Sequence, residues 1–154
     1  MSNDQEQTRQ QEPIRVLFLC THNSSRSQMA EGLLRARGGD RYAVFSAGTH
    51  PRGVHPLAIQ VMREVGIDIS EGAGHRAKSL DEFVGQPPID LVVTVCDDAA
   101  EECPFFPGAR RQEHWGFPDP SAVSGSEEER LAAFRSVRDA IASRVETFLS
   151  AMVS

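Results

Sequence analysis

The chain has 154 residues, 40% of them hydrophobic and 25% charged, which is ordinary for a globular protein large enough to build one core. Its net charge of −6 argues against broad nucleic-acid binding, although a ring of amides and one arginine can still bind a small anion. The sequence contains no apolar run of membrane-spanning length and no hydrophobic signal segment in the polar stretch 1–13, so we expect a disordered N-terminal tail, no membrane partner and a cytoplasmic location.

Four strands are predicted after this tail. The first, 14–19, is an apolar run of strand length, typical of a strand buried on both faces of a parallel sheet. Residues 42–47 and 89–95 are predicted as the second and third strands, and the third is the clearest. Residues 111–115 predict a short fourth strand.

The segments between the strands carry helical patterns. A first helix is expected from Ser25 to the glycine stop at Gly38. Pro56 opens a second helix that ends near Gly66, and Ser79 caps a short third one. The second helix is expected to bury the face formed by Ile59, Met62 and Val65.

The C-terminal segment predicts a long amphipathic helix. Ser126 is its expected N-cap, and the acidic run 127–129 lies in the first turn, where the helix dipole favours negative charge. Its apolar stripe consists of Leu131, Phe134, Val137, Ile141, Val145 and Phe148. The alternation of strands and helices indicates one α/β domain over residues 14–154, a four-stranded parallel sheet with helices on both faces.

Two of the three cysteines follow predicted strands. Cys20 comes after the first strand and Cys96 after the third, and sheets of this kind bind ligands outside the carboxyl ends of their strands. An odd number of cysteines excludes a fully paired set of structural disulfides. The two thiols therefore mark one edge of the sheet as the candidate functional edge.

The segment from Cys20 to Arg26 joins the first strand to the first helix. Its amides can turn inward beside the positive end of the helix and form an anion nest, which also favours a thiolate. Arg26 can bind an oxyanion through two parallel hydrogen bonds, Ser27 can donate to the sulfur, and Asn23 can brace the loop. The expected oxyanion-binding residues are Thr21, His22, Asn23, Ser24, Ser25, Arg26 and Ser27. An inert, buried Cys20 is the alternative.

The motif CTHNSSRSQMAE resembles the signature loop of the low-molecular-weight protein tyrosine phosphatase family. The resemblance continues through FSAG, HPLAIQVMREVGIDIS, DLVVTVC and HWGFPDPS, and it implies a four-stranded, flavodoxin-like parallel sheet flanked by helices. It also implies that Cys20 is the nucleophile, Arg26 the oxyanion clamp and Asp119 the general acid. Considered without the family, Asp119 between two prolines is either a general acid or an ordinary turn residue.

The segment CDDAAEEC, with its flanking sequences VVTVC and CPFFPGARRQEHWGFPDP, resembles the thioredoxin-coupled arsenate reductases built on this phosphatase scaffold. The resemblance implies that Cys20 attacks arsenate and that Cys96 then attacks the Cys20 sulfur and releases arsenite. Cys103 next forms a disulfide with Cys96, which thioredoxin reduces, so the expected role is arsenic detoxification. The residues alone leave open a zinc site of Cys96, Cys103 and His114, or two unrelated buried thiols.

Two other functions stay open. A low-molecular-weight protein tyrosine phosphatase would use the same loop, and weak phosphatase activity is expected even of a reductase. The family's acid loop usually carries tyrosines, whereas the only tyrosine here is Tyr42, inside a predicted strand. A non-catalytic oxyanion or redox sensor would need neither Asp119 nor the additional thiols. Trp115 and Phe117 are expected to belong to the core, or to shape the acid loop.

No cofactor is expected to be required. Some members of the family bind potassium through Asn, Glu, Ser and Asp, and Asn23, Glu31 and Ser46 match three of these positions. The fourth position falls near His75, a poor ligand for an alkali metal. Arg52 and His55 border the expected mouth of the site, where they either attract anions or lie in an exposed loop.

Overall fold

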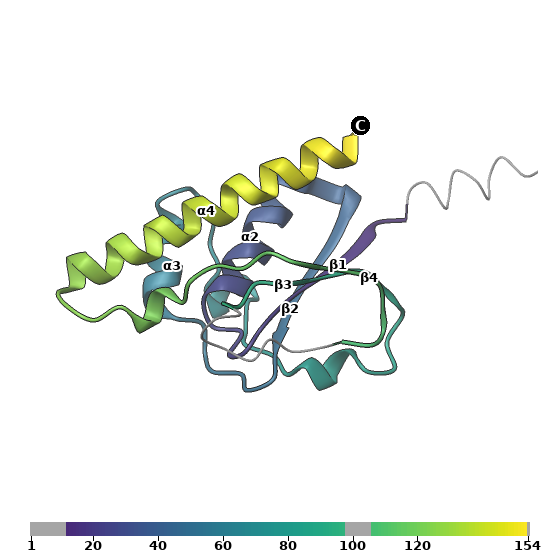
Figure 1. The fold of residues 1–154 in the computed structure, drawn as a ribbon, viewed down its shortest axis with the longest axis horizontal. Coiled ribbons are helices and arrows are strands. Elements are labelled where there is room, and N and C mark those ends of the chain that lie inside the picture. Colours follow the sequence, from purple (N-terminus) through teal and green to yellow (C-terminus); the bar gives the residue numbers. More distant parts are fainter. Residues whose placement is uncertain (1–11, 98–105, 154) are drawn as a thin grey trace, which may run out of the picture.

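The computed structural model describes residues 12–97 and 106–153. Within these ranges the strands β1 (Ile14–Cys20), β2 (Tyr42–Gly48), β3 (Ile89–Thr94) and β4 (Ala109–His114) form one parallel sheet in the order β2-β1-β3-β4 (Figure 1). All four strand predictions are confirmed. The expected tail, except for residues 12 and 13, lies outside the described residues, as does Cys103.

The α-helices of the described residues pack on one face of the sheet. They are α2 (Arg26–Gly38), α3 (Pro56–Arg63) and α4 (Glu127–Val153), and α4 runs along the outside of the layer (Figure 1). Short 3-10 helices complete the pattern: η1 (Gly39–Arg41), η2 (Glu71–Ala73), η3 (Leu80–Phe83) and η4 (Pro120–Ala122). None of the described helices is both long and apolar enough to cross a membrane.

Side chains of β1 alternate between two apolar clusters because successive residues of a strand point to opposite faces. Val16 and Phe18 belong to the larger cluster, which the α-helices cover. Leu17 and Leu19 belong to the smaller cluster on the other face, together with Phe106 and the partly buried side chains of η3. Helices therefore cover both faces, as predicted, with the α-helices on one side and the 3-10 helix η3 on the other.

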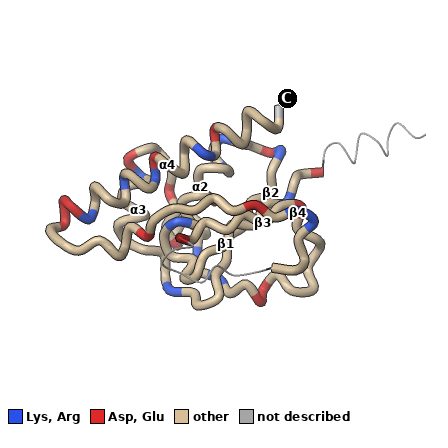
Figure 2. Tube along the Cα trace, viewed as in Figure 1, with Lys and Arg blue, Asp and Glu red and all other residues tan. Residues whose placement is uncertain are grey.

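The structure confirms the N-cap and the buried apolar stripe that were predicted for the long C-terminal helix. The Oγ of Ser126 accepts from the Glu129 N–H at 3.1 Å, and the Glu129 Oε1 accepts from the Ser126 N–H at 3.3 Å, which completes a capping box. Acidic residues occupy this first turn (Figure 2). The buried stripe contains the predicted residues Leu131, Phe134, Val137, Ile141, Val145 and Phe148.

The buried face of α3 differs from the prediction. Met62 is buried and Ile59 half-buried, but Val65 is 42% exposed. The helix ends at Arg63 and the chain turns at Gly66, whose φ of 80° a glycine adopts without strain, so Val65 lies beyond the helix and off its buried face. The residues that α3 buries are Leu57, Ala58, Val61 and Met62.

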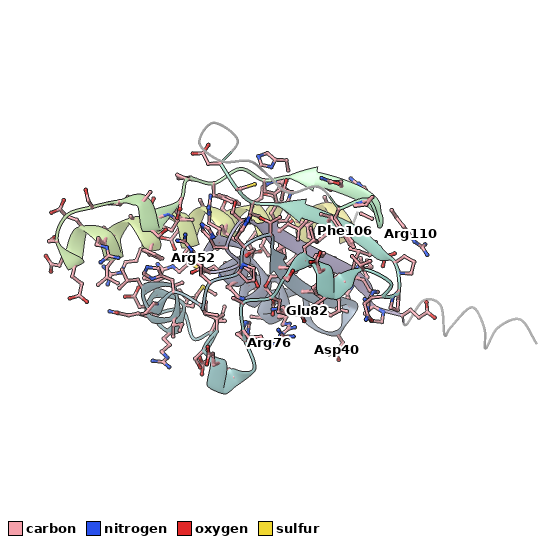
Figure 3. The ribbon with its side chains drawn as sticks, turned by 90° about the horizontal axis from the view of Figure 1, so that it is seen from below. Asp40, Arg52, Arg76, Glu82, Phe106 and Arg110 are labelled. Atoms are coloured by element: carbon pink, nitrogen blue, oxygen red, sulfur yellow. The ribbon has the colours of Figure 1, made fainter. Side chains whose placement is uncertain are left out.

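The short helix predicted after Ser79 is the 3-10 helix η3, and Ser79 is its N-cap. The Ser79 Oγ accepts from the Asp81 N–H at 3.1 Å. Glu82 binds Arg76 through two hydrogen bonds of 2.6 and 3.0 Å, and these two residues lie together on the surface (Figure 3).

Trp115 and Phe117 are buried, which confirms that they belong to the core. The Trp115 ring packs against Phe18 of β1 and Phe148 of α4, with centroid distances of 5.6 and 5.7 Å. Its backbone N–H donates to the Thr94 carbonyl at 2.8 Å. This tryptophan therefore ties the end of β3 to the helical layer.

Candidate active site

Cys20 lies at the carboxyl end of β1, where the strand order changes direction. The chain passes from β1 to β2 on one side and reaches β3 on the other, and ligands of parallel sheets bind at such a switch point. A cavity of about 360 Å³ opens there, and Cys20, a free thiol, is one of its walls. The other lining residues are His22, Ser24, Ser25, Arg26, Arg52, Gly53, His55, Pro56, Asp119 and Ser121.

A buried hydrogen-bond chain ends on the sulfur of Cys20. The Asn23 Nδ2 donates to the Ser27 Oγ at 2.8 Å, and the Ser27 Oγ lies 3.0 Å from the Cys20 Sγ. Because this hydroxyl already accepts from Asn23, its own hydrogen is free to donate to the sulfur. The chain therefore places a hydroxyl donor against the sulfur at the edge of the cavity.

The carbonyls of the loop are turned away from the cavity by the segment 50–55. Three backbone N–H groups donate to them at 2.8, 2.9 and 3.0 Å: His50 to Thr21, Arg52 to His22, and His55 to Ser24. A trans peptide holds its C=O and N–H on opposite sides, and the described chain contains no cis peptide. The N–H groups of His22, Asn23 and Ser25 therefore point to the other side of the loop, where an anion can accept from them.

Gly48, the last residue of β2, leaves room for this loop. A Cβ added to it would lie 2.5 Å from the Thr21 carbonyl oxygen and 2.8 Å from that of Cys20. Both contacts are with backbone atoms that cannot move aside. The predicted loop thus depends on a glycine in the neighbouring strand.

Arg26, the first residue of α2, connects the Cys20 loop to the Asp119 loop. Its Nη1 donates to the Phe117 carbonyl at 3.0 Å, and its Nη2 lies 3.8 Å from the Asp119 Oδ2. The Asp119 Oδ1 accepts from both the N–H and the Oγ of Ser121, at 2.9 and 2.7 Å. Oδ1 is thus engaged locally, and Oδ2 faces the guanidinium.

The structure brings Cys20, Arg26 and Asp119 around one cavity. Among the expected oxyanion-binding residues, His22, Ser24, Ser25 and Arg26 line it, Asn23 and Ser27 are buried beneath it, and Thr21 contributes a carbonyl to the outer side of the loop.

Arg52 and His55, which were expected to border the mouth of the site, line the cavity, and so does Ser121, which the sequence did not indicate. Arg52 lies toward the carboxyl ends of the strands, whereas Arg110 lies at the opposite end of the sheet (Figure 3). The sequence signal for His55 was its place directly before Pro56, the first residue of a helix. No sequence feature marked Ser121, whose N–H and hydroxyl donate to the carboxylate of Asp119.

Cys96 lies at the end of β3, next to the end of β1. The Val95 N–H donates to the Leu19 carbonyl at 2.9 Å, so the two backbone segments continue side by side toward Cys96 and Cys20. Cys96 is fully buried and is disulfide-bonded in this structure, whereas Cys20 is free. Cys103 falls outside the described residues.

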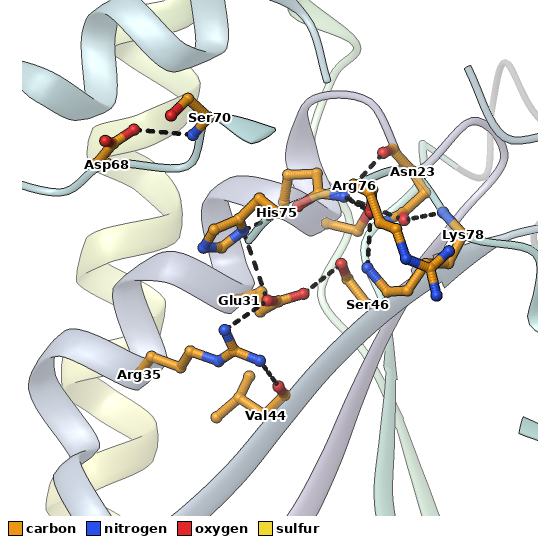
Figure 4. A network of polar contacts seen from close by, with 12 residues as sticks. Asn23, Glu31, Arg35, Val44, Ser46, Asp68, Ser70, His75, Arg76 and Lys78 are labelled. Atoms are coloured by element: carbon orange, nitrogen blue, oxygen red, sulfur yellow. Dashed lines mark hydrogen bonds and ion pairs between the residues drawn. The ribbon is translucent and has the colours of Figure 1, made fainter. Parts of the chain in front are cut away.

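A buried polar network supports the loop from behind (Figure 4). The Asn23 Oδ1 accepts from the Gln28 Nε2 at 3.1 Å and from the Lys78 backbone N–H at 2.8 Å. Asn23 itself has a φ of 48°, a left-handed conformation that asparagine tolerates better than most residues. Its side chain is therefore committed to holding the loop.

The other residues that match the family's potassium positions are also bonded to protein groups. The Ser46 Oγ donates to the Glu31 Oε1 at 2.5 Å. The Glu31 Oε2 lies 3.2 Å from the Arg35 Nη1 and 3.5 Å from the His75 Nδ1 (Figure 4). With a guanidinium on Glu31 and two N–H donors on Asn23, the residues present do not fit a potassium site. Among the described residues, no group of three or more His, Cys, Asp or Glu could hold a metal ion.

Comparison with known proteins agrees with this geometry. Residues 15–154 match the low molecular weight phosphotyrosine protein phosphatase family. An arsenate reductase of Halalkalibacterium halodurans is 47% identical over 133 residues, which are 86% of this chain and 93% of the relative.

Two solved structures share the fold. One, described as an arsenate reductase in the phosphate binding state, has a TM-score of 0.69 and 34% identity and covers 88% of this chain and 96% of its own. A thioredoxin-dependent arsenate reductase from Corynebacterium glutamicum has a TM-score of 0.63 and 26% identity, with 94% of this chain matching 65% of that one.

The family match extends over both the cysteine loop and the Asp119 loop, so it covers every described part of the cavity. The resemblance inferred from the sequence motifs is confirmed. The chain belongs to the low molecular weight phosphotyrosine protein phosphatase family, and arsenate reductases are among its relatives.

Proposed function

We propose that this protein reduces arsenate to arsenite with its own cysteines and that thioredoxin returns it to the reduced form. One observation carries the proposal: the oxyanion cavity around Cys20 lies beside a second cysteine, Cys96, on the neighbouring strand end. A phosphatase needs only the first of these thiols. The arsenate reductases among the relatives, one of them described as thioredoxin-dependent, support the same conclusion.

The first step is attack of the Cys20 thiolate on arsenic. Inward amides and Arg26 bind the arsenate oxygens, and Ser27 stabilises the thiolate until the sulfur–arsenic bond forms. One arsenic–oxygen bond breaks, and the Asp119 Oδ2, when protonated, supplies the proton with which that oxygen leaves as water. Arsenic is still As(V) after this step.

The second step reduces arsenic. The Cys96 thiolate attacks the Cys20 sulfur, a disulfide forms between them, and the electron pair of the sulfur–arsenic bond stays on arsenic, which leaves as arsenite, As(III). Cys103 then attacks Cys96, so that Cys20 is released as a thiolate. A dithiol of thioredoxin reduces the Cys96–Cys103 disulfide with two electrons.

The test measures arsenite formation with thioredoxin, thioredoxin reductase and NADPH. Cys20→Ser should produce no arsenite and no phosphate from an aryl phosphate, because a serine hydroxyl is not an effective nucleophile at neutral pH without a strong base. Arsenite formed by this variant at the wild-type rate would refute the role of Cys20.

The other two cysteines distinguish the reductase from a phosphatase, the alternative that the family match favours. Cys96→Ser should release little arsenite but keep its aryl phosphatase activity, which uses only Cys20, Arg26 and Asp119. Cys103→Ser should complete one turnover and stop with Cys20 and Cys96 joined, as peptide mapping would show. If Cys96→Ser turns over arsenate normally and arsenate consumes no thiols, the relay is wrong and the phosphatase function replaces it.

A further inference from the structure

We propose that His55 is a substrate-binding residue whose Nε2–H donates a hydrogen bond to the oxyanion in the Cys20 cavity. The inference rests on the proposed oxyanion function but does not require that the oxyanion be reduced. It gives the site a neutral donor in addition to the loop amides and Arg26.

The position of His55 is fixed by the same loop that binds the anion. Its backbone N–H donates to the Ser24 carbonyl at 3.0 Å. Its ring packs against Phe134 of α4 at a centroid distance of 4.7 Å and forms part of the cavity wall, together with Cys20 and Asp119. The imidazole is therefore held at the mouth of the site from two sides.

One hydrogen bond decides which ring nitrogen carries the proton. The Leu57 backbone N–H donates to the His55 Nδ1 at 3.1 Å, which caps the N-terminus of α3. A backbone N–H can only donate, so Nδ1 must be the bare nitrogen and the neutral ring carries its hydrogen on Nε2. Among residues 12–97 and 106–153, this Nε2–H has no hydrogen-bond acceptor, whereas a tetrahedral oxyanion in the cavity would supply one.

The surroundings keep the ring neutral. Burial lowers the pKa of His55, and the positive charge of Arg130 on α4 lowers it further, while Asp119 opposes them. The N-cap acts in the same direction, because protonated Nδ1 could no longer accept from Leu57. A neutral N–H can bind an anion without competing with Arg26 for Asp119.

The substitution His55→Asn separates substrate binding from helix capping. Asparagine is among the best N-cap residues, so the variant keeps the cap, but its short side chain loses the Nε2–H. His55→Ala loses both. We expect His55→Asn to weaken binding of inorganic phosphate, and to raise the KM for arsenate, by about tenfold, because one hydrogen bond to a charged acceptor is lost. Its melting temperature should stay near that of the wild type, whereas that of His55→Ala should fall.

A purely structural role predicts the opposite pattern. In that case His55→Asn would bind phosphate with wild-type affinity, and only His55→Ala would be impaired, which would overturn the proposal. If His55→Asn does not fold, ¹⁵N NMR of the wild-type imidazole decides: a shift of the His55 Nε2–H signal on adding phosphate supports the contact, and an unchanged signal refutes it. If the wild-type protein binds phosphate but forms no arsenite, the reductase function is refuted, whereas the role of His55 in binding the anion is not.

Discussion

The loop that carries Cys20 and the loop that carries Asp119 line the same cavity but are held in opposite ways. Residues 20–27 are fixed by long-range bonds from segment 50–55 and from Lys78, and by the buried side chain of Asn23. Asp119 receives its hydrogen bonds from Ser121, two residues away, and meets the rest of the site through Arg26.

This difference separates two requirements of the chemistry. An oxyanion site gains from donors that are already in position, because they need no rearrangement when charge develops. A proton donor has to follow an oxygen that leaves, and a loop with few long-range bonds can adjust at small cost. Arg26 belongs to both regions, so substitutions at Arg26 and on either side of it test the comparison.

Arg26→Lys should have the largest effect, because it breaks both regions at once. A lysine cannot donate to the Phe117 carbonyl and also bind an oxyanion through two parallel bonds. We expect kcat/KM for arsenate to fall by roughly 10²–10³-fold, the usual cost of losing a preorganised donor to a developing anion. Steady-state kinetics would measure it, and a variant that keeps a third of the activity would contradict the clamp role.

Asp119→Asn should affect only the second region. An amide of the same shape cannot supply the proton, so kcat should fall by about 10²-fold, while the affinity for inorganic phosphate stays within about twofold. Ser121→Ala is the matched control, since it keeps the carboxylate and removes only one local bond. A phosphate affinity that falls together with kcat would show that the two loops are not independent.

Asn23→Ala should affect the first region mainly through stability. The substitution removes the donor to Ser27, leaves the Lys78 N–H without its acceptor and takes away one of the three acceptors of the Gln28 amide. It also places alanine in a left-handed conformation that alanine disfavours. We expect a loss of about 2–4 kcal/mol in the free energy of unfolding, measured with urea. Asn23→Gly keeps the conformation and isolates the bonds, and a loss no larger than that of an ordinary surface substitution would count against the network.

Glu64→Gln, remote from both loops, should have the smallest effect. Hydrogen bonding to Arg135, and secondarily to Arg138, lowers the pKa of Glu64 from 4.5 to about 2. A lowered carboxyl pKa stabilises the fold above pH 4.5, and this contribution is lost as the pH falls from 4.5 through about 2. The variant should therefore unfold at a slightly higher pH during acid titration and keep wild-type kinetics, whereas unchanged acid unfolding would contradict the prediction.

The strands and the active edge could be predicted because they depend on local patterns. Largely apolar segments marked the first three strands, and the rule that parallel strands end at one edge brought Cys20 and Cys96 together. The buried face of α3 could not be predicted in the same way. Val65 matches the helical spacing, but the helix ends two residues earlier.

The parts of the site that the sequence left undecided depend on contacts between distant segments. Nothing in the sequence near His55 shows that its N–H binds Ser24 or that its ring faces the cavity. The residues that match the family's potassium positions show the same limit, because here the sequence suggested a site that the fold does not support. Asn23 and Glu31 match the family pattern by residue type, and only the fold shows that protein donors already occupy their oxygens.

The single tryptophan of the chain gives the site a built-in optical probe. The Trp115 ring packs between Phe18 and Phe148. Its backbone N–H donates to the carbonyl of Thr94, two residues before Cys96, and Trp115 lies two residues before the Phe117 carbonyl that accepts from Arg26. A change in the redox state of Cys96, or the binding of an anion at Arg26, therefore alters the surroundings of the indole through one or two bonded neighbours. Its fluorescence can therefore follow single turnovers in a stopped-flow instrument without any added label.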